Sequence, residues 1–153
     1  MDGNVYKSLL NGKDMTYDFV ICSGYFNPLH KGHVEYLQLA RKLGKELWVI
    51  MNNDEQVKIK GSKPFMDLDE RCVIVKELKS VDNIFISVDT DPSVCESIKE
   101  LGKKLGGTKC FAKGGDRFVN EIPEAKICME LGIDIVDGLG KKIQNSSDLL
   151  KDY

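Results

Sequence analysis

The sequence predicts one doubly wound α/β domain built on a five-stranded parallel sheet. Three observations support this fold class. The chain alternates short apolar runs with longer amphipathic stretches, which is typical of strands joined by crossover helices. Its 153 residues suit a single domain with its own core. Its composition, 42% hydrophobic and 30% charged, is that of a packed globular protein and excludes the disordered, collagen-like and coiled-coil classes.

Five strands are expected, because five short and mostly apolar runs are each bounded by Gly, Asp, Asn or Lys. They span Asp18–Ser23, Glu46–Met51, Asn83–Ser87, Lys109–Ala112 and Ile133–Val136.

Between these runs, apolar residues recur at helical spacing. The expected helices span Lys31–Leu43, Asp67–Leu78, Pro92–Leu105, Glu121–Leu131 and a last segment from Ser146 to near the C-terminus. Gly44 is expected to stop the first of them, and Asp67 to cap the N-terminus of the second.

The charge balance limits the classes of partner. With 22 basic and 24 acidic residues the net charge is −2, which gives no strong field for nucleic acid or an anionic membrane. The longest apolar runs, Phe19–Cys22 and Leu47–Met51, are far shorter than the ~20 residues of a spanning helix. Residues 1–16 lack the apolar stretch of a signal peptide. We therefore expect a cytoplasmic protein without nucleic-acid or membrane partners, with an N-terminal extension over 1–16 and a domain over 17–153.

Five cysteines form an odd set without a C-x-x-C pair, at Cys22, Cys72, Cys95, Cys110 and Cys128. This pattern indicates neither a disulfide framework nor a zinc site. We expect most of them to be small buried apolar residues.

Ligands of open parallel sheets bind beyond the carboxyl ends of the strands, so the loops that follow the strands are the places to search. Four such loops carry unusual residues: Ser23–His33, Asn52–Asp67, Lys113–Pro123 and Asp137–Ser147.

The first of these loops carries the strongest signal, because both histidines of the chain lie in it, in the segment GYFNPLHKGH at 24–33. Gly24 lets the strand turn, and Gly32 lets a ligand approach the amides of a helix start. His30 and His33 share a face of the first helical turn and can donate to phosphate oxygens or, when protonated, offset their charge. The alternatives are a pair of capping histidines and half of a metal site.

At these residues the sequence resembles the H-x-G-H nucleotidyltransferase superfamily, whose cytidylyltransferase-like members have a Rossmann-like fold. The resemblance runs from about residue 18 to 150 through Lys58-Ile59-Lys60-Gly61, Asp69-Glu70-Arg71, Ala112-Lys113-Gly114-Gly115-Asp116 and Gln144-Asn145-Ser146-Ser147. The Lys-Gly-Gly-Asp segment is most similar to the glycerol-3-phosphate cytidylyltransferase and heptose-1-phosphate adenylyltransferase branch. Phe26-Asn27-Pro28 is also similar to the nicotinate mononucleotide adenylyltransferases.

The resemblance implies an enzyme that condenses a nucleoside triphosphate with a sugar- or polyol-phosphate acceptor and releases pyrophosphate. CTP is the expected donor and ATP the alternative, and a non-catalytic nucleotide-binding module is the distant rival. The resemblance also implies Mg²⁺ held mainly by the nucleotide phosphates, and a homodimer.

The same resemblance assigns residues to three roles. The expected catalytic residues are His30, His33 and Lys60. The expected nucleotide contacts are Gly24, Tyr25, Phe26, Asn27, Gly32, Lys113, Gly114, Asp116, Gln144, Asn145, Ser146 and Ser147. Supporting positions are Lys58, Lys63, Arg71 and Arg117, where Arg71 is alternatively a helix-surface partner of Asp67.

Overall fold

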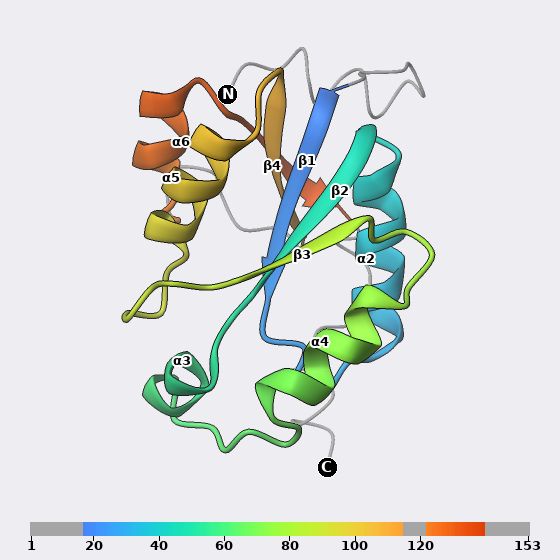
Figure 1. The fold of residues 1–153 in the computed structure, drawn as a ribbon, viewed down its shortest axis with the longest axis vertical. Coiled ribbons are helices and arrows are strands. Elements are labelled where there is room, and N and C mark those ends of the chain that lie inside the picture. The colour runs from blue at the N-terminus through green and yellow to red at the C-terminus, as the bar shows by residue number, and fades with distance from the viewer. Residues whose placement is uncertain (1–16, 115–121, 140–153) are drawn as a thin grey trace.

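The structure, a computed structural model, describes residues 17–114 and 122–139 and forms one parallel sheet in this part of the chain (Figure 1). The strands lie in the order β3-β2-β1-β4-β5, and every neighbouring pair is parallel. They span β1 Tyr17–Gly24, β2 Gly44–Met51, β3 Asn83–Ile86, β4 Lys109–Gly114 and β5 Asp134–Leu139. The predicted five-stranded doubly wound sheet is confirmed.

Helices cover both faces of this sheet. They span α2 Lys31–Arg41, α3 Asp54–Ile59, α4 Leu68–Lys76, α5 Cys95–Lys104 and α6 Ala125–Leu131. Helices α2 and α4 pack on one face and α5 and α6 on the other (Figure 1), while α3 follows the carboxyl end of β2. The chain order reverses between β2-β1 and β4-β5, which places the switch point at the carboxyl ends of β1 and β4.

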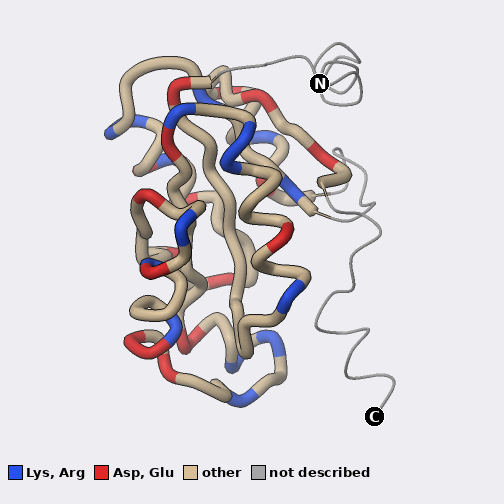
Figure 2. Tube along the Cα trace, turned by 90° about the vertical axis from the view of Figure 1, so that its right-hand side faces the viewer, with Lys and Arg blue, Asp and Glu red and all other residues tan. Residues whose placement is uncertain are grey.

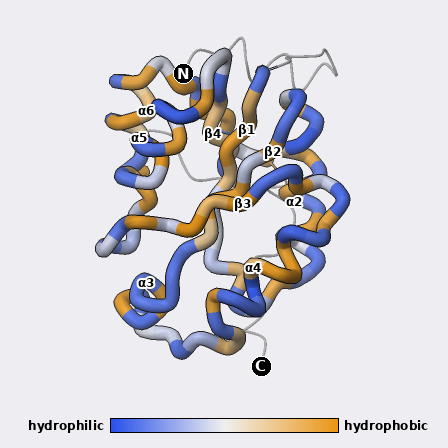
Figure 3. The backbone as a smooth tube through the Cα atoms, viewed as in Figure 1, coloured by the Kyte–Doolittle hydropathy of each residue, from blue (hydrophilic) through white to orange (hydrophobic). Residues whose placement is uncertain are grey.

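Alternation along the strands divides the core into two layers. In β1, Val20 and Cys22 pack with α2 and α4, whereas Ile21 packs with α5 and α6. Both kinds of side chain are fully buried because a parallel sheet covered on both faces has no solvent side. Figure 3 accordingly shows hydrophobic colouring through the central strands and mixed colouring on the helices.

Two expectations about the first half of the chain were wrong. Gly44 does not stop α2, which ends at Arg41 and is capped by Lys42 in a right-handed conformation. Gly44 instead begins β2, where a Cβ would lie 2.6 Å from the carbonyl oxygen of Tyr17. The second loop is also not entirely a loop, because it contains α3, whose N-cap is Asn53.

Other expectations agree with the described residues. Asp67 caps α4 by accepting a hydrogen bond from the amide of Glu70 at 2.9 Å. All five cysteines are free thiols, and all but Cys95 are buried. Figure 2 shows Lys and Arg interspersed with Asp and Glu along the trace, and no helix in the described ranges is long and apolar enough to cross a membrane. The expected extension at 1–16 and the helix from Ser146 lie outside these ranges.

Candidate active site

The two histidines cap helix α2 together. His30 is the N-cap, and its Nδ1 accepts a hydrogen bond from the amide of Gly32 at 3.0 Å. The Nδ1 of His33 accepts one from the amide of His30 at 3.1 Å, and the two rings stack with their centroids 3.8 Å apart. Because each Nδ1 is an acceptor, each ring carries its proton on Nε2. The capping interpretation is therefore correct, and it leaves both Nε2–H groups as donors.

One of these donors has no partner. Among the described residues, Nε2 of His30 is the one buried side-chain nitrogen or oxygen atom without a hydrogen bond. A buried N–H group without a partner is costly, and an oxygen of a ligand would satisfy it. The amide of Gly32, by contrast, is already bonded to His30, so it is not free for a ligand as the sequence suggested.

Both histidines are electrically neutral at neutral pH. The pKa of His33 is lowered to about 4, mainly by burial and to a smaller extent by the nearby His30 and Lys60. Burial also lowers the pKa of His30. In the unliganded protein the neutral pair therefore offers N–H donors and does not carry the positive charge that protonated histidines would supply.

Phe26 packs against this histidine pair. Its ring is buried and meets the ring of His33 edge to face, with centroids 5.0 Å apart. Phe26 has a φ of 50°, which is unusual for a side chain other than glycine. A Cβ on Gly24 would lie 2.7 Å from this ring, so the glycine leaves room for Phe26. Gly24 and Phe26 thus shape the site by packing.

Lys60 lies next to the histidines. It caps the C-terminus of α3 and places its Nζ 4.4 Å from the centroid of the Tyr25 ring. Its charge also acts on His33. Lys58, two residues earlier, is paired with Glu55 at 3.5 Å. The structure therefore brings Lys60 close to Tyr25 and His33.

Asn27 connects the first loop to the second. Its Nδ2 donates to the carbonyl oxygen of Lys63 at 2.9 Å, and its Oδ1 accepts from the amides of Phe65 and Met66 at 2.6 and 3.3 Å. These contacts use both polar atoms of the side-chain amide. Asn27 therefore holds two site loops together, and Lys63 takes part through its carbonyl oxygen.

Arg71 is the largest fully buried side chain of the described core, with 0% exposure. Its guanidinium donates to the carbonyl oxygens of Tyr25 and Asn52, both at 2.8 Å, and to that of Met66 at 3.1 Å. It also pairs with Asp54 at 2.7 Å. Arg71 thus joins the ends of β1 and β2 to the start of α3.

The alternative for Arg71, a surface ion pair with Asp67, is wrong. The side chain of Asp67 accepts from the amide of Glu70 in the cap of α4, and the carboxylate that pairs with Arg71 belongs to Asp54. A buried arginine needs several acceptors at once, and its planar five-donor fork can serve four groups here.

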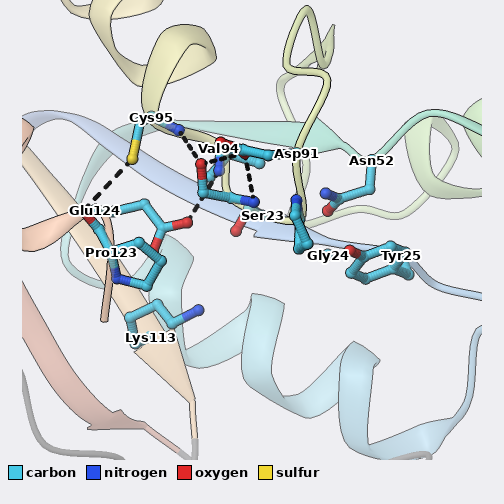
Figure 4. Close-up of a pocket in the computed structure, with 12 residues that line it drawn as sticks. Ser23, Gly24, Tyr25, Asn52, Asp91, Val94, Cys95, Lys113, Pro123 and Glu124 are labelled. Atoms are coloured by element: carbon cyan, nitrogen blue, oxygen red, sulfur yellow. Dashed lines mark hydrogen bonds between the residues drawn. The ribbon is translucent and has the colours of Figure 1, made fainter. Parts of the chain in front are cut away.

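A cavity of about 520 Å³ lies at the switch point of the sheet (Figure 4). It is lined by Ser23, Gly24, Tyr25, Asn52, Asp91, Pro92, Ser93, Val94, Cys95, Lys113, Pro123 and Glu124. Its size suits a small ligand, and its position between β1 and β4 is where doubly wound sheets bind them.

This cavity is lined by two carboxylates that the sequence analysis did not single out. Glu124, which is buried, accepts the amide of Val94 at 2.9 Å, and Asp91 accepts the amide and hydroxyl of Ser93 at 2.9 and 2.6 Å. Burial is the main cause that raises the pKa of Tyr25, and the charges of Glu124 and Asp91 raise it further. Neither residue belongs to a recognisable motif. The sequence signal that could have indicated them is their position, since Asp91 precedes α5 and Glu124 precedes α6.

Tyr25 belongs to both parts of the site. One neighbour of its ring is Lys60, and the same residue lines the cavity with Asn52 beside it (Figure 4). Glu124 and Lys113 lie at the other side of the cavity in that view. Tyr25 therefore lies between the ammonium group of Lys60 and the cavity.

The remaining expected residues divide into two groups. Lys113 lines the cavity, and Gly114 packs closely, since a Cβ there would lie 3.2 Å from the carbonyl oxygen of Leu139 and 3.3 Å from Tyr36. The others lie outside the described residues, namely Asp116, Arg117, Gln144, Asn145, Ser146 and Ser147.

The fold and the histidine-capped helix that follows β1 define the class of this protein as a nucleotidyltransferase-like α/β domain. The sequence model of the family described as Cytidylyltransferase-like matches residues 21–137. The chain belongs to this family, which confirms the resemblance seen in its motifs.

Named relatives agree with this membership. An FAD synthase from Methanocella arvoryzae is 36% identical over 114 residues, which are 74% of this chain and 76% of the relative. An FAD synthase from Methanoregula boonei is 44% identical over 77 residues, 50% of this chain and 51% of the relative. The bifunctional protein HldE of Actinobacillus pleuropneumoniae is 40% identical over 105 residues, 67% of this chain and 21% of that protein. The chain thus spans about half of the Methanoregula relative and about a fifth of HldE.

Solved structures share the fold. The lipopolysaccharide core biosynthesis protein from Thermoplasma volcanium superposes with a TM-score of 0.63 at 25% identity, covering 79% of this chain and 95% of that one. A bifunctional NMN adenylyltransferase/ADP ribose pyrophosphatase from Francisella tularensis has a TM-score of 0.61 at 13% identity, covering 90% of this chain and 42% of that one, and shows the fold alone.

Proposed function

We propose that this protein transfers a nucleotidyl group from a nucleoside triphosphate to a small phosphate-bearing acceptor and releases pyrophosphate. The observation that carries the proposal is the capping pair itself. His30 and His33 each use Nδ1 to hold the helix start, so each presents an Nε2–H, and that of His30 is buried and unbonded within the described chain. Lys60 adds a positive charge beside them.

The chemistry follows from the charges. An acceptor phosphate oxygen is already an anion at neutral pH, so it attacks the α-phosphorus of the triphosphate without a general base. A phosphorus–oxygen bond to the acceptor forms while the bond to the β-phosphate oxygen breaks, and pyrophosphate leaves with that electron pair. The protein needs to orient the two phosphates and to stabilise charge that develops on the oxygens, which N–H donors and a lysine can do.

We rank ATP ahead of CTP as the donor, which reverses the order expected from the Lys-Gly-Gly-Asp segment. The relatives that support this ranking are the FAD synthases, because the dinucleotide in their name contains an adenylyl half. CTP stays the second candidate, since the family description and the glycerol-3-phosphate cytidylyltransferase resemblance favour it.

The cavity supports a hydroxyl-rich acceptor. Glu124 and Asp91 each use one carboxylate oxygen on a backbone amide, and a carboxylate has two oxygens, so each keeps capacity to accept hydrogen bonds from a ligand. Carboxylates repel phosphate and bind hydroxyl groups. We therefore place the phosphates near Lys60 and the sugar or polyol part in the cavity. FMN fits this description, since it joins a ribityl phosphate to a flavin and is the other half of FAD.

Mg²⁺ is proposed to arrive with the triphosphate. No group of three His, Cys, Asp or Glu residues in the described ranges could hold a metal ion, so the nucleotide phosphates and water would supply its ligands, as is usual for this ion. Bound in this way, it would reduce the negative charge of the triphosphate.

The test is a turnover assay of the full chain with Mg²⁺. ATP, CTP, GTP and UTP are each combined with FMN, a heptose 1-phosphate or glycerol 3-phosphate, and pyrophosphate release is measured. We expect release with ATP and at least one acceptor. Release with CTP alone would restore the original ranking. Stabilisation by a nucleotide in a thermal-shift experiment without release in any combination would favour the non-catalytic binding module. The homodimer, a further proposal, is checked by light scattering.

A further inference from the structure

Lys60 stands at the end of a helix that is too short to hold its own position. Helix α3 has six residues, Asp54–Ile59, and isolated helices of this length are not stable in water. The amide of Lys60 bonds to the carbonyl oxygen of Gln56 at 3.1 Å. The placement of Lys60 therefore depends on what fixes the turn that contains Gln56.

Gln56 is fully buried, and its side chain bonds to four groups. Its Oε1 accepts from Nδ2 of Asn52 at 3.1 Å and from the amide of Asn53 at 3.0 Å. Its Nε2 donates to the carbonyl oxygens of Asp91 and Ser93, at 2.7 and 2.8 Å. One side chain thus connects α3 to the end of β2 and to a segment more than thirty residues further along the chain.

That segment forms part of the cavity wall. Asp91 and Ser93 both line the cavity. Asn53, the N-cap of α3, adds two further bonds to the same stretch through Nδ2, to the carbonyl oxygens of Ser87 and Asp89, both at 3.1 Å. Four side-chain hydrogen bonds to backbone carbonyl oxygens therefore hold the start of helix α3 to residues 87–93, and two of them go to residues that line the cavity.

We infer that Gln56 is a positioning residue that keeps Lys60 at a fixed place relative to the cavity. The amide group suits this position because two acceptors face its Nε2 and two donors face its Oε1. A glutamate has the same shape but no donor for the two carbonyl oxygens, and an apolar residue leaves all four groups unbonded. The inference rests on the proposed function in one respect, which is the catalytic role that the proposed function assigns to Lys60.

A double-mutant cycle tests the inference by turnover. Because small displacements of a catalytic group lower rates strongly, Gln56→Ala should lower kcat by about tenfold or more when Lys60 is present. In a Lys60→Ala background the same change should lower kcat by less than about twofold, since residues that act through one another are not additive. Gln56→Glu should resemble Gln56→Ala. Glu55→Ala, on the exposed side of the same helix, is the matched control and should leave kcat unchanged.

A spectroscopic measurement tests the inference without turnover. The side-chain CH₂ signals of Lys60 next to the Tyr25 ring should be shifted upfield in the ¹³C-labelled full chain, and Tyr25→Leu identifies them. Gln56→Ala should abolish the shift, and Glu55→Ala should keep it. If Gln56→Ala does not fold, Asn53→Ala removes the two bonds to Ser87 and Asp89 and should reduce the shift in the same direction.

The outcomes separate the two proposals. Equal losses of kcat from Gln56→Ala in both backgrounds, or an unchanged Lys60 signal in the folded variant, would overturn the inference. An unchanged kcat in Lys60→Ala would remove Lys60 from the catalytic residues, while nucleotidyl transfer by the wild-type chain would stand and the Lys60 signal would decide the inference. Absence of transfer by the wild-type chain would refute the proposed function, and the Lys60 signal would still decide whether Gln56 positions it.

Discussion

His30 and His33 form a capping box at the start of α2, in which the side chain of each accepts a hydrogen bond from a backbone amide. The amide of His30 donates to Nδ1 of His33 at 3.1 Å, while Nδ1 of His30 accepts from the amide of Gly32 at 3.0 Å. Both rings are thereby held in one tautomer and stacked 3.8 Å apart. The helix cap thus fixes the orientation of the donors that we assign to the triphosphate.

His33→Gln separates capping from catalysis. Glutamine is a usual residue at this position of a capping box, so its side-chain oxygen can accept from the amide of His30 and preserve the helix start. It lacks the imidazole Nε2–H in the same place, so kcat should fall by about 100-fold. His33→Ala should lose both functions and be less stable than His33→Gln by about 1 kcal/mol. Near-normal turnover of His33→Gln would remove His33 from the catalytic residues.

The three lysines of the second loop should differ in their effects. Lys60→Ala should lower kcat more than Lys58→Ala or Lys63→Ala, because Lys60 alone among them is near both Tyr25 and His33 in the described structure. Lys58 is paired with Glu55 on the exposed surface, where ion pairs contribute little. Steady-state kinetics with Mg²⁺ and ATP measures the order. The reverse order would show that another lysine contacts the phosphates.

The pKa of His33 should report on the triphosphate. In the free protein it should lie near 4, and bound phosphate charge should raise it because an anion favours the protonated ring. Proton NMR can follow the titration without crowding, since the chain has two histidines, and His30→Gln assigns the signals. Titration of His33 near 6.5 in the free protein would contradict its burial.

The same pKa predicts how stability depends on pH. Between pH 6.5 and about 4 the unfolded chain protonates His33 and the folded chain does not, so the unfolded state binds more protons. The contribution of neutral His33 to the free energy of unfolding is therefore complete above pH 6.5 and declines as the pH falls toward 4. Urea unfolding at several pH values should show a smaller decline in His33→Gln. An equal decline in the variant and the wild type would assign the pH dependence to other groups.

Arg71→Met should destabilise the fold and displace the site. It leaves the carbonyl oxygens of Tyr25, Asn52 and Met66 without their donor and Asp54 without its partner, so the free energy of unfolding should fall by about 3 kcal/mol or more.

Arg71→Lys is the matched control for Arg71→Met. It keeps the charge for Asp54 but loses the planar fork, and should fall between the wild type and Arg71→Met. Denaturant unfolding measures the series, and a loss below about 1 kcal/mol for Arg71→Met would mean that the three backbone segments hold each other without it.

The sequence by itself determined the sheet, most helices and the family. Strand and helix periods are local properties, so the five strands could be located to within a few residues. The motif around His30 and His33 could be read because a helix start after a strand places residues three apart on one face. The same resemblance led to the proposal of Lys60, since Lys60-Gly61 is the lysine–glycine pair of the second loop.

The tertiary structure alone decided which partners these residues have. The sequence could not distinguish a buried Arg71 that organises the site from an Arg71 in a surface ion pair. Its partner Asp54 and the three carbonyl oxygens come from segments that only folding brings together. The contacts of Asn27 with the second loop could not be predicted either, because Lys63 and Phe65 lie 36 and 38 residues further along the chain. Asp91, Glu124 and Gln56 belong to no motif, and any two of them lie 33 to 68 residues apart along the chain. Their importance arises from long-range packing around one cavity, which the pattern of neighbouring residues does not encode.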